Sequence, residues 1–220
     1  MRLVEDLQSE DTDDFEALVI TGDGKSENRR LRPLIDHYDD DRILWLPTRS
    51  ERHFTRVGRS TEHPTTERRG WEALDAIKLY KGRGITRFLF IVDSEHTTNG
   101  GKEDLEAKIE EIASFDDFEI EEVGQGAYVS EFKVGSRDVV LYTAIVGDEY
   151  GFIEDCLGKL LELEWDNRIE EDSKTEYKSS INRTLSGGTG RMLIEGADRE
   201  NLHESFPGLD TILRTFENPN

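Results

Sequence analysis

The sequence of 220 residues contains one cysteine, Cys156, which excludes an intrachain disulfide and a cysteine-rich metal site. Because Cys156 stands among leucines at helical spacing, we expect it in the core and not as a nucleophile. No run of about 18 apolar residues occurs, which excludes a membrane-spanning helix of the usual length. The stretch 1–14 is acidic and polar, unlike a signal peptide. We therefore expect a cytoplasmic protein without membrane association.

Basic residues are also scarce, since 28 lysines and arginines stand against 49 aspartates and glutamates, giving a formal net charge of -21. Such a charge often accompanies disorder or an acidic tail. Here the acids are spread through segments with clear apolar periodicity, which favours a folded chain. This enrichment fits the acidic proteome of an archaeal type of cell with a salt-rich cytoplasm, where screening removes self-repulsion. We therefore predict a halophilic protein whose stability rises with salt.

Apolar runs alternate with amphipathic segments along the first three quarters of the chain. Four runs, beginning near Phe15, Arg42, Arg87 and Val139, have the apolar character of buried parallel strands. Apolar residues at helical spacing predict helices at 27–38, 69–81, 103–114 and 152–165. The alternation predicts an α/β fold with a mainly parallel sheet of about four strands and helices on both faces. Alternating patterns at 118–123 and 127–134 are further strand candidates.

The domain organisation follows from the same pattern. We expect one α/β domain over residues 1–165, interrupted by a basic, polar insertion at about 48–68. The remainder, 166–220, is polar and less periodic, and it predicts a helical extension packed on the same domain. Within it, helices are expected near 174–185 and 209–216.

Acidic residues follow three of the four predicted strands. Asp23 follows the first strand, Asp93 and Glu95 follow the third, and Glu154 and Asp155 begin the helix after the fourth. Because parallel strands end at one edge of a sheet, these carboxylates can converge there. Clustered carboxylates without cysteine favour Mg²⁺ or Mn²⁺, and such ions support phosphoryl chemistry. The alternative is that these acids cap helices and complement helix dipoles.

A basic island interrupts the acidic chain. From Arg42 to Arg87, 11 basic residues outnumber five acidic ones, so this segment is positive within a strongly negative protein. A basic segment of this kind indicates contacts with the phosphate backbone of a nucleic acid. The candidate contacts in and near the island are Lys25, Arg29, Arg49, Arg52, Arg56 and Arg59. The alternative is that the arginines pair with the acidic surface of the protein itself.

Three segments resemble motifs of Toprim domains. Residues 22–27, Gly-Asp-Gly-Lys-Ser-Glu, resemble the Val-Glu-Gly-Lys-Ser-Asp signature that precedes a helix in those domains. Residues 91–95, Ile-Val-Asp-Ser-Glu, resemble their second motif, an acidic pair after a central strand. Residues 151–155, Gly-Phe-Ile-Glu-Asp, resemble a segment of a stand-alone Toprim-like family of uncharacterised function. The resemblance spans roughly residues 15–165.

This resemblance implies a Toprim-like three-layer fold and metal-dependent processing of nucleic-acid phosphodiesters. Toprim domains occur in primases, topoisomerases, recombination-repair proteins and nucleases. The resemblance implies an acid/base role for Asp23, a Mg²⁺ or Mn²⁺ site at Asp93 and Glu95, and assistance from Glu154 or Asp155. Because no tyrosine is placed clearly as a topoisomerase nucleophile, a nuclease is the first hypothesis.

The chain also departs from the Toprim pattern. Asp23 stands where the family has glutamate, Glu95 stands where aspartate is usual, and the third acid of the second motif falls near Thr97. Two alternatives to a nuclease therefore stay open. One is a catalytically inactive Toprim-fold module with a nucleic-acid-binding or regulatory role. The other is a halophilic interaction domain. The oligomeric state does not follow from the sequence.

Overall fold

The most apolar segment of the chain forms the centre of a sheet. In the computed structural model, which describes residues 1–4, 15–22, 26–38, 42–46 and 70–217, this segment is strand β4 (Arg87–Asp93). Its last six residues are all buried. β4 pairs in parallel with β2 (Phe15–Thr21) on one side and with β7 (Arg137–Val146) on the other. Because both of its faces are covered, its continuous apolar run is the pattern expected of an interior parallel strand.

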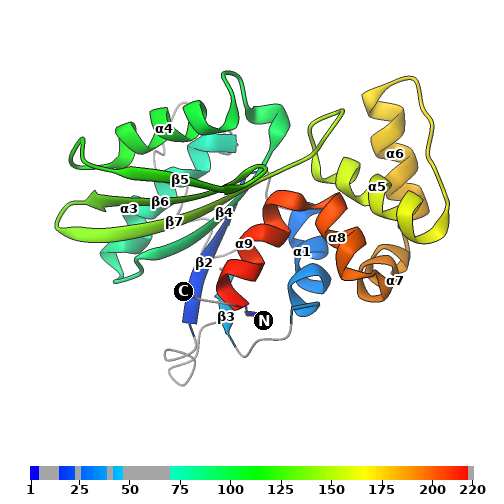
Figure 1. Cartoon of the computed structure of the whole chain (residues 1–220), viewed down its shortest axis with the longest axis horizontal. Coiled ribbons are helices and arrows are strands. Elements are labelled where there is room, and N and C mark those ends of the chain that lie inside the picture. Colours follow the sequence, from blue (N-terminus) through cyan, green and yellow to red (C-terminus); the bar gives the residue numbers. More distant parts are fainter. Residues whose placement is uncertain (5–14, 23–25, 39–41, 47–69, 218–220) are drawn as a thin grey trace, which may run out of the picture.

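The described residues form a sheet of seven strands in the order β1-β3-β2-β4-β7-β6-β5 (Figure 1). β1 (Arg2–Val4), β3 (Ile43–Trp45), β2, β4 and β7 run in parallel, whereas β6 (Ala127–Val134) and β5 (Glu119–Gly124) are antiparallel. The prediction of a mainly parallel sheet is confirmed. The predicted number of about four strands is too low, because those four are only the middle of the sheet. β1 is three residues long, which is too short to produce a periodic pattern.

Helices connect and cover the strands. They are α1 (Ser26–Asp36), the 3₁₀ helix η3 (Gly70–Asp75) followed by α3 (Ala76–Gly82), η4 (Ser94–His96), α4 (Gly101–Ile112), α5 (Ile153–Trp165), α6 (Lys174–Thr184), α7 (Thr189–Gly196), α8 (Arg199–Ser205) and α9 (Pro207–Glu217). α7 and α8 are absent from the sequence prediction, because their short apolar stripes lie among glycines and charged residues. No helix in the described part of the chain is both long and apolar enough to cross a membrane.

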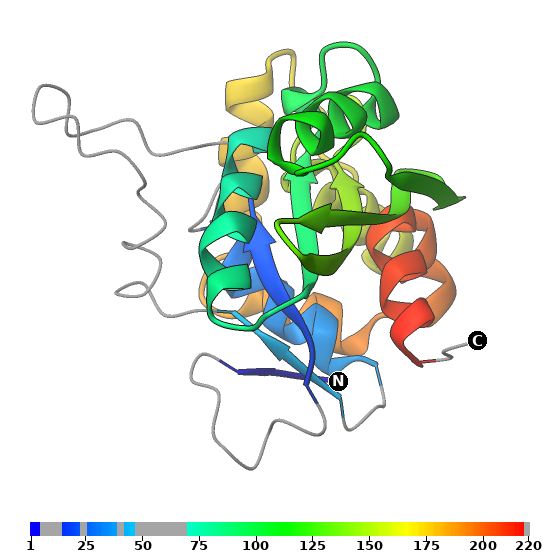
Figure 2. The ribbon, with the colours of Figure 1, turned by 90° about the vertical axis from the view of Figure 1, so that its left-hand side faces the viewer.

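The sheet separates two hydrophobic cores, and alternate residues of β4 belong to each. Leu89 and Ile91 pack into the core formed with α1, α5 and α9, whereas Phe88 and Phe90 pack into the core formed with α3 and α4. This is the two-residue period of a strand that is buried on both faces. In Figure 2, α3 (teal) and α9 (red) lie on opposite sides of the strands. The arrangement is therefore three-layered, with helices on both faces as the sequence predicts.

The helices after Trp165 share a core with the sheet. Ile181 of α6, Leu193 of α7, Leu202 of α8 and Phe216 of α9 all belong to the core on the α1 side. α9 lies directly on the sheet, where the rings of Phe216 and Tyr142 meet edge to face at 4.6 Å. α6, α7 and α8 pack instead on α5, α1 and α9, so they extend this core outward from the helices that cover the sheet.

The order of the strands creates a switch point between β2 and β4. From β2 the chain continues through α1 to β3, and from β4 it continues through α4 towards β7 on the opposite side. α1 and α4 belong to different cores, so they cover opposite faces. Such an arrangement leaves a crevice beyond the carboxyl ends of the two strands, which is where open α/β sheets bind ligands.

Candidate functional site

The ends of β2 and β4 lie together at the switch point. The backbone N–H of Gly22 donates to the carbonyl oxygen of Ile91 at 2.9 Å, and the N–H of Gly70 donates to the carbonyl oxygen of Gly22 at 3.1 Å. The segment that leads into Asp23 is therefore held against the segment that ends in Asp93. This is the convergence of the first and third strand ends that the sequence predicts.

Gly70, which follows the basic insertion in the sequence, also lies at this edge. Gly70 has φ +54° and stands against the ring of His96, where a Cβ atom would lie 2.7 Å from Cγ. A side chain at this position would clash, and the positive φ favours glycine independently. The indole nitrogen of Trp71 donates to the carbonyl oxygen of His96 at 3.1 Å. Gly70 and Trp71, which follow the insertion in the sequence, therefore lie beside His96, the residue after Glu95.

Several predicted site residues lie outside the described part of the chain. These are Asp23, Lys25, Arg49, Arg52, Arg56 and Arg59. Arg29 belongs to helix α1, but its side chain is also outside the described part. The roles assigned to these residues stay predictions.

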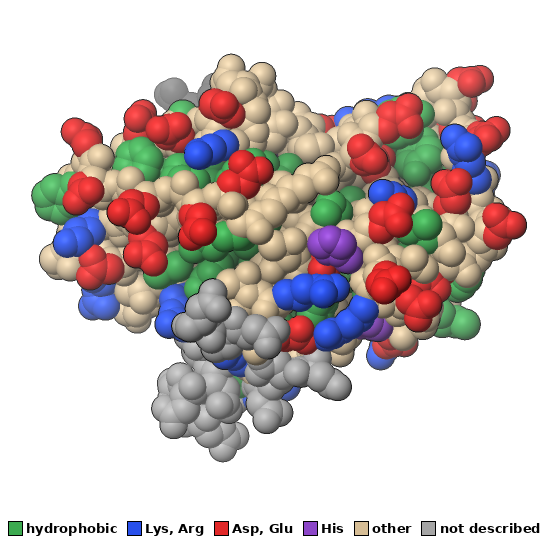
Figure 3. Space-filling model, in the orientation of Figure 1, with side chains coloured by type: hydrophobic (Ala, Val, Ile, Leu, Met, Phe, Trp, Pro, Cys, Tyr) green, Lys and Arg blue, Asp and Glu red, His purple; other side chains and the backbone are tan. Residues whose placement is uncertain are grey.

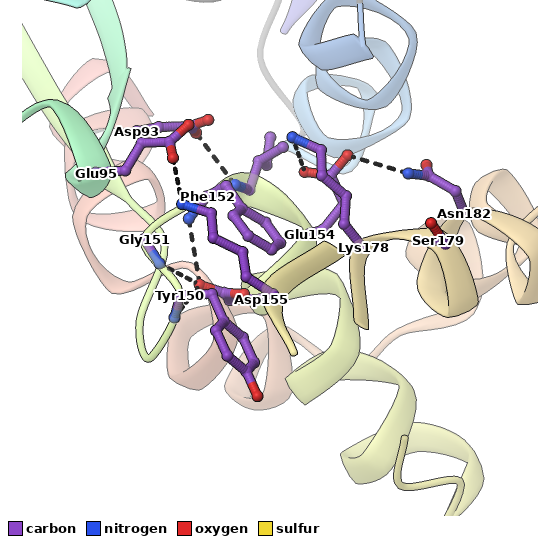
Figure 4. Close-up of polar contacts among 12 residues, drawn as sticks. Asp93, Glu95, Tyr150, Gly151, Phe152, Glu154, Asp155, Lys178, Ser179 and Asn182 are labelled. Carbon is purple, nitrogen blue, oxygen red and sulfur yellow. Dashed lines mark hydrogen bonds and ion pairs between the residues drawn. The ribbon is translucent and has the colours of Figure 1, made fainter. Parts of the chain in front are cut away.

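Asp93 connects the central strand to helix α5. Its side chain is buried, and Oδ1 accepts a hydrogen bond from the backbone N–H of Ile153, the first residue of α5, at 3.1 Å (Figure 4). The first N–H groups of a helix have no partner within the helix and favour a negative group. Asp93 therefore satisfies one of these groups while its carboxylate lies at the carboxyl end of β4.

Glu95 follows in η4 and is partly exposed. Its backbone N–H donates to the carbonyl oxygen of Gly151 at 2.8 Å, which joins η4 to the loop before α5. Its side chain, labelled in Figure 4, forms an ion pair with Lys174 at the start of α6. Gly151 has φ +84°, and a Cβ atom there would lie 2.8 Å from the backbone nitrogen of Glu95. The close approach of the two loops therefore requires glycine.

Glu154 lies in the first turn of α5 and is 1% exposed. Its Oε2 is 3.6 Å from Nζ of Lys178, and its Oε1 accepts a hydrogen bond from Nδ2 of Asn182 at 3.5 Å. Lys178 and Asn182 are four residues apart and therefore project from one face of α6. In this conformation Glu154 anchors α6 against α5.

Asp155 organises the loop that precedes α5. Its Oδ2 accepts four backbone hydrogen bonds, from Asp148 at 3.1 Å, Tyr150 at 3.0 Å, Gly151 at 2.7 Å and Phe152 at 3.2 Å. Burial raises the pKa of the Asp155 carboxyl and these hydrogen bonds lower it, with a raised pKa as the net result. This geometry is that of a helix-capping residue. The sequence allows either capping or metal ligation for Asp155.

Clustered acids elsewhere surround an ammonium group. Within the described part of the chain, Glu72, Asp75 and Glu111 are three acids whose ligand atoms lie within 4.8 Å of one another. Nζ of the buried Lys108 lies 3.2, 3.3 and 2.8 Å from their oxygens, respectively. A positive charge therefore already stands where a metal would bind. We infer that the three acids serve to neutralise the buried charge of Lys108.

The predicted metal ligands differ in how well they suit Mg²⁺ or Mn²⁺. Asp93 and Glu95 supply hard carboxylate oxygens at the end of the central strand, and these are the donors that such ions prefer. Glu154 is committed to α6, and Oδ2 of Asp155 to four backbone N–H groups. Asp93, whose Oδ1 accepts one backbone N–H, and Glu95, whose ion pair with Lys174 is partly exposed, are therefore the candidates for a divalent cation, whereas Glu154 and Asp155 belong to the scaffold around it.

Sequence reasoning did not identify the lysines of α6. Lys174 and Lys178 approach Glu95 and Glu154, and their Nζ atoms lie 5.1 and 4.7 Å from the centre of the Phe152 ring. Contacts of this kind stabilise a cation by the negative face of the ring. The four-residue spacing of the two lysines in a predicted helix was a usable signal, but their acidic partners lie far away in the sequence.

A cleft beside the site is lined mainly by acids. It has a volume of about 650 Å³ and lies between α5, α6 and the segment that joins them. Its acidic lining residues are Asp148, Glu149, Asp155, Glu162, Glu170, Glu171 and Asp172. Lys159 and Arg168 also line the cleft, so its lining is negative on balance, which disfavours the binding of phosphate there. Elsewhere, Figure 3 shows acidic side chains scattered over the visible face, with basic ones between them.

Comparison of the chain with protein-family models, with curated proteins and with solved structures found no match. The motifs and the geometry of the switch point are therefore the features that indicate a function.

Proposed function

We propose that this chain is a Toprim-like protein that processes nucleic-acid phosphodiesters with Mg²⁺ or Mn²⁺, most simply as a nuclease. The observation that carries the proposal is the position of Asp93, a buried carboxylate at the end of the central strand, at the switch point of the sheet. The neighbouring strand β2 ends at the same edge, where Gly22 is hydrogen-bonded to Ile91, and Asp23 is the next residue in the sequence. Carboxylates at a switch point are well placed to hold a ligand-binding cation.

In this proposal Asp93 and Glu95 hold the cation and Asp23 exchanges the proton. Such an ion polarises a phosphate oxygen and makes a bound water more acidic. Glu154 and Asp155 position the site indirectly, because they fix α6 and the loop before α5. The basic residues Lys25, Arg29, Arg49, Arg52, Arg56 and Arg59 hold the phosphate backbone. This division of roles is supported by Gly70, which follows the basic insertion in the sequence and contacts Gly22 and His96 at the end of the sheet.

The test is a comparison of wild type with Asp93→Asn in molar KCl. Mg²⁺ and Mn²⁺ binding is measured by calorimetry, and cleavage is measured on single- and double-stranded DNA and RNA. Because an asparagine oxygen can still accept the N–H of Ile153, the fold is retained while the negative charge is lost. Asp138→Asn is the matched control, since Asp138 is highly exposed and pairs with Lys133 on the β6–β7 hairpin.

We expect Asp93→Asn to lose cation binding and cleavage, and Asp138→Asn to retain both. Cleavage that Asp93→Asn leaves intact would refute the proposed site.

The second candidate function is a catalytically inactive module that binds nucleic acid. It is favoured by the ion pairs of Glu95 and Glu154 with lysines and by the shorter acid at position 23. Cation binding that depends on Asp93, without cleavage of any substrate, would support this function. If no cation binding depends on Asp93, the remaining hypothesis is a halophilic interaction domain.

A further inference from the structure

Helix α6 places two ammonium groups at the candidate site. Lys174 forms an ion pair with Glu95, and Lys178 lies 3.6 Å from Glu154 (Figure 4). Both ammonium groups also lie over the ring of Phe152. The lysines are one helical turn apart, so a single face of α6 supplies both charges.

The two ion pairs differ in their exposure. The side chains of Lys174 and Glu95 are 46% and 29% exposed, so water can replace either partner at little cost in free energy. Glu154 is 1% exposed and also accepts a hydrogen bond from Asn182, so separating it from Lys178 would leave a buried charge poorly compensated. Lys178 is therefore an anchor for α6, whereas Lys174 can exchange its partner.

In the proposed site, a divalent cation would compete with the ammonium group of Lys174 for the carboxylate of Glu95. Mg²⁺ binds carboxylate oxygens directly, and a positive charge beside the same carboxylate opposes it. Once Glu95 binds the cation, the ammonium group of Lys174 needs another anion. The phosphate backbone of a nucleic acid supplies one, and lysine binds phosphate as a point charge.

We propose that Lys174 is an exchangeable counter-cation of the metal site. It neutralises Glu95 before the metal binds, and it transfers to a phosphate of the nucleic acid when the metal takes Glu95. This inference rests on the proposed function. It predicts that metal and nucleic acid each strengthen the binding of the other, because each removes one partner of the same ion pair and coupling between two ligands is reciprocal.

The test uses wild type, Lys174→Met and the matched control Lys159→Met. Lys159 is also a partly exposed lysine in an ion pair, but its partner is Glu204 of α8. Affinity for Mg²⁺ alone is measured by calorimetry. Affinity for a 20-base-pair DNA duplex, with and without Mg²⁺, is measured by fluorescence anisotropy over a series of KCl concentrations immediately after mixing. Urea unfolding of each variant confirms that it is folded.

We expect Lys174→Met to bind Mg²⁺ about threefold more tightly, which is the range of an exposed ion pair. In the presence of Mg²⁺ it should bind DNA more weakly, with a salt slope smaller by about one phosphate contact. The mutual strengthening of the two ligands should also disappear. Lys159→Met should behave as wild type.

The alternative is an ion pair that only fixes α6. If wild type binds Mg²⁺ in an Asp93-dependent way and Lys174→Met leaves this affinity unchanged or lower, the exchange is refuted and the proposed function stands. Tighter Mg²⁺ binding with unchanged DNA binding refutes the transfer to phosphate. If wild type shows no Asp93-dependent Mg²⁺ binding, the proposed function is refuted and the inference with it.

Discussion

Replacement of Asp155 separates its structural role from metal ligation. Oδ2 of Asp155 accepts four backbone hydrogen bonds, and those from Gly151 and Phe152 lie in buried surroundings. Asp155→Ala removes all four bonds. Water can reach the N–H groups of Asp148 and Tyr150, which are only partly buried, but the two buried groups would be left without an acceptor.

The magnitude follows from these two buried groups. An unsatisfied buried donor costs about 1–3 kcal/mol, which gives roughly 2–6 kcal/mol for the pair. Burial raises the pKa of the Asp155 carboxyl, so the charged form is itself less favourable in the folded protein. This offsets part of the loss. We therefore expect Asp155→Ala to lower the free energy of unfolding by about 2–3 kcal/mol at neutral pH.

Asp155→Asn is the matched variant. Its amide oxygen can replace Oδ2, and its NH₂ group then occupies the buried position of Oδ1, which has no hydrogen-bond partner among the described residues. Loss of the buried charge offsets part of the cost of these unpaired donors, so we expect a loss of about 1–2 kcal/mol, smaller than that of Asp155→Ala.

The measurement is urea unfolding in 2 M KCl, with and without 10 mM Mg²⁺, at a constant m value. If Asp155 is structural, the deficit of Asp155→Ala is the same with and without Mg²⁺. An Asp155→Ala protein within about 0.5 kcal/mol of wild type would refute the argument. If Asp155→Ala loses stability only in the presence of Mg²⁺, Asp155 would instead be a metal ligand.

Three further predictions concern the rest of the chain. Gly151→Ala should destabilise the fold by about 1–3 kcal/mol in urea, because φ is +84° and Cβ would lie 2.8 Å from the backbone nitrogen of Glu95; a neutral effect would contradict this packing. The melting temperature should rise by about 5–10 °C between 0.1 and 2 M KCl as salt screens the net charge of -21; an unchanged value would refute the halophilic prediction. Burial raises the pKa of Asp104, but hydrogen bonds from Thr98 and Asn99 together lower it by more than burial raises it. The net pKa is therefore below its ordinary value of 3.8. Its contribution to stability is therefore present above pH 3.8 and lost as the pH falls through the folded value. Asp104→Asn should flatten the acid limb of the stability curve, and an identical limb would contradict this.

The sequence identified the middle of the sheet because the signal there is local. Each of β2, β3, β4 and β7 is a short apolar run between turn residues, and such a run requires no knowledge of its neighbours. The same logic located Asp93, since a residue after a buried parallel strand lies at the carboxyl edge of the sheet. The strand β1 escaped detection because three residues give no period, and its place beside β3 comes from the tertiary pairing.

The partners of the acids could be found only in the folded chain. Lys174 lies 79 residues after Glu95, and Lys178 lies on a different helix from Glu154. Composition predicts that many of the 49 acids will form ion pairs, but it does not predict which basic residue pairs with each acid.

The sequence by itself therefore determined the fold class, the central strands and the edge at which β2 and β4 end, since these follow from periodicity and from the direction of parallel strands. Only the tertiary structure decided that Asp155 holds a loop, that Glu154 anchors α6 and that Glu95 is paired with a lysine. Ion pairs and hydrogen bonds act over a few ångströms, and contacts at that range between distant residues depend on how the helices pack.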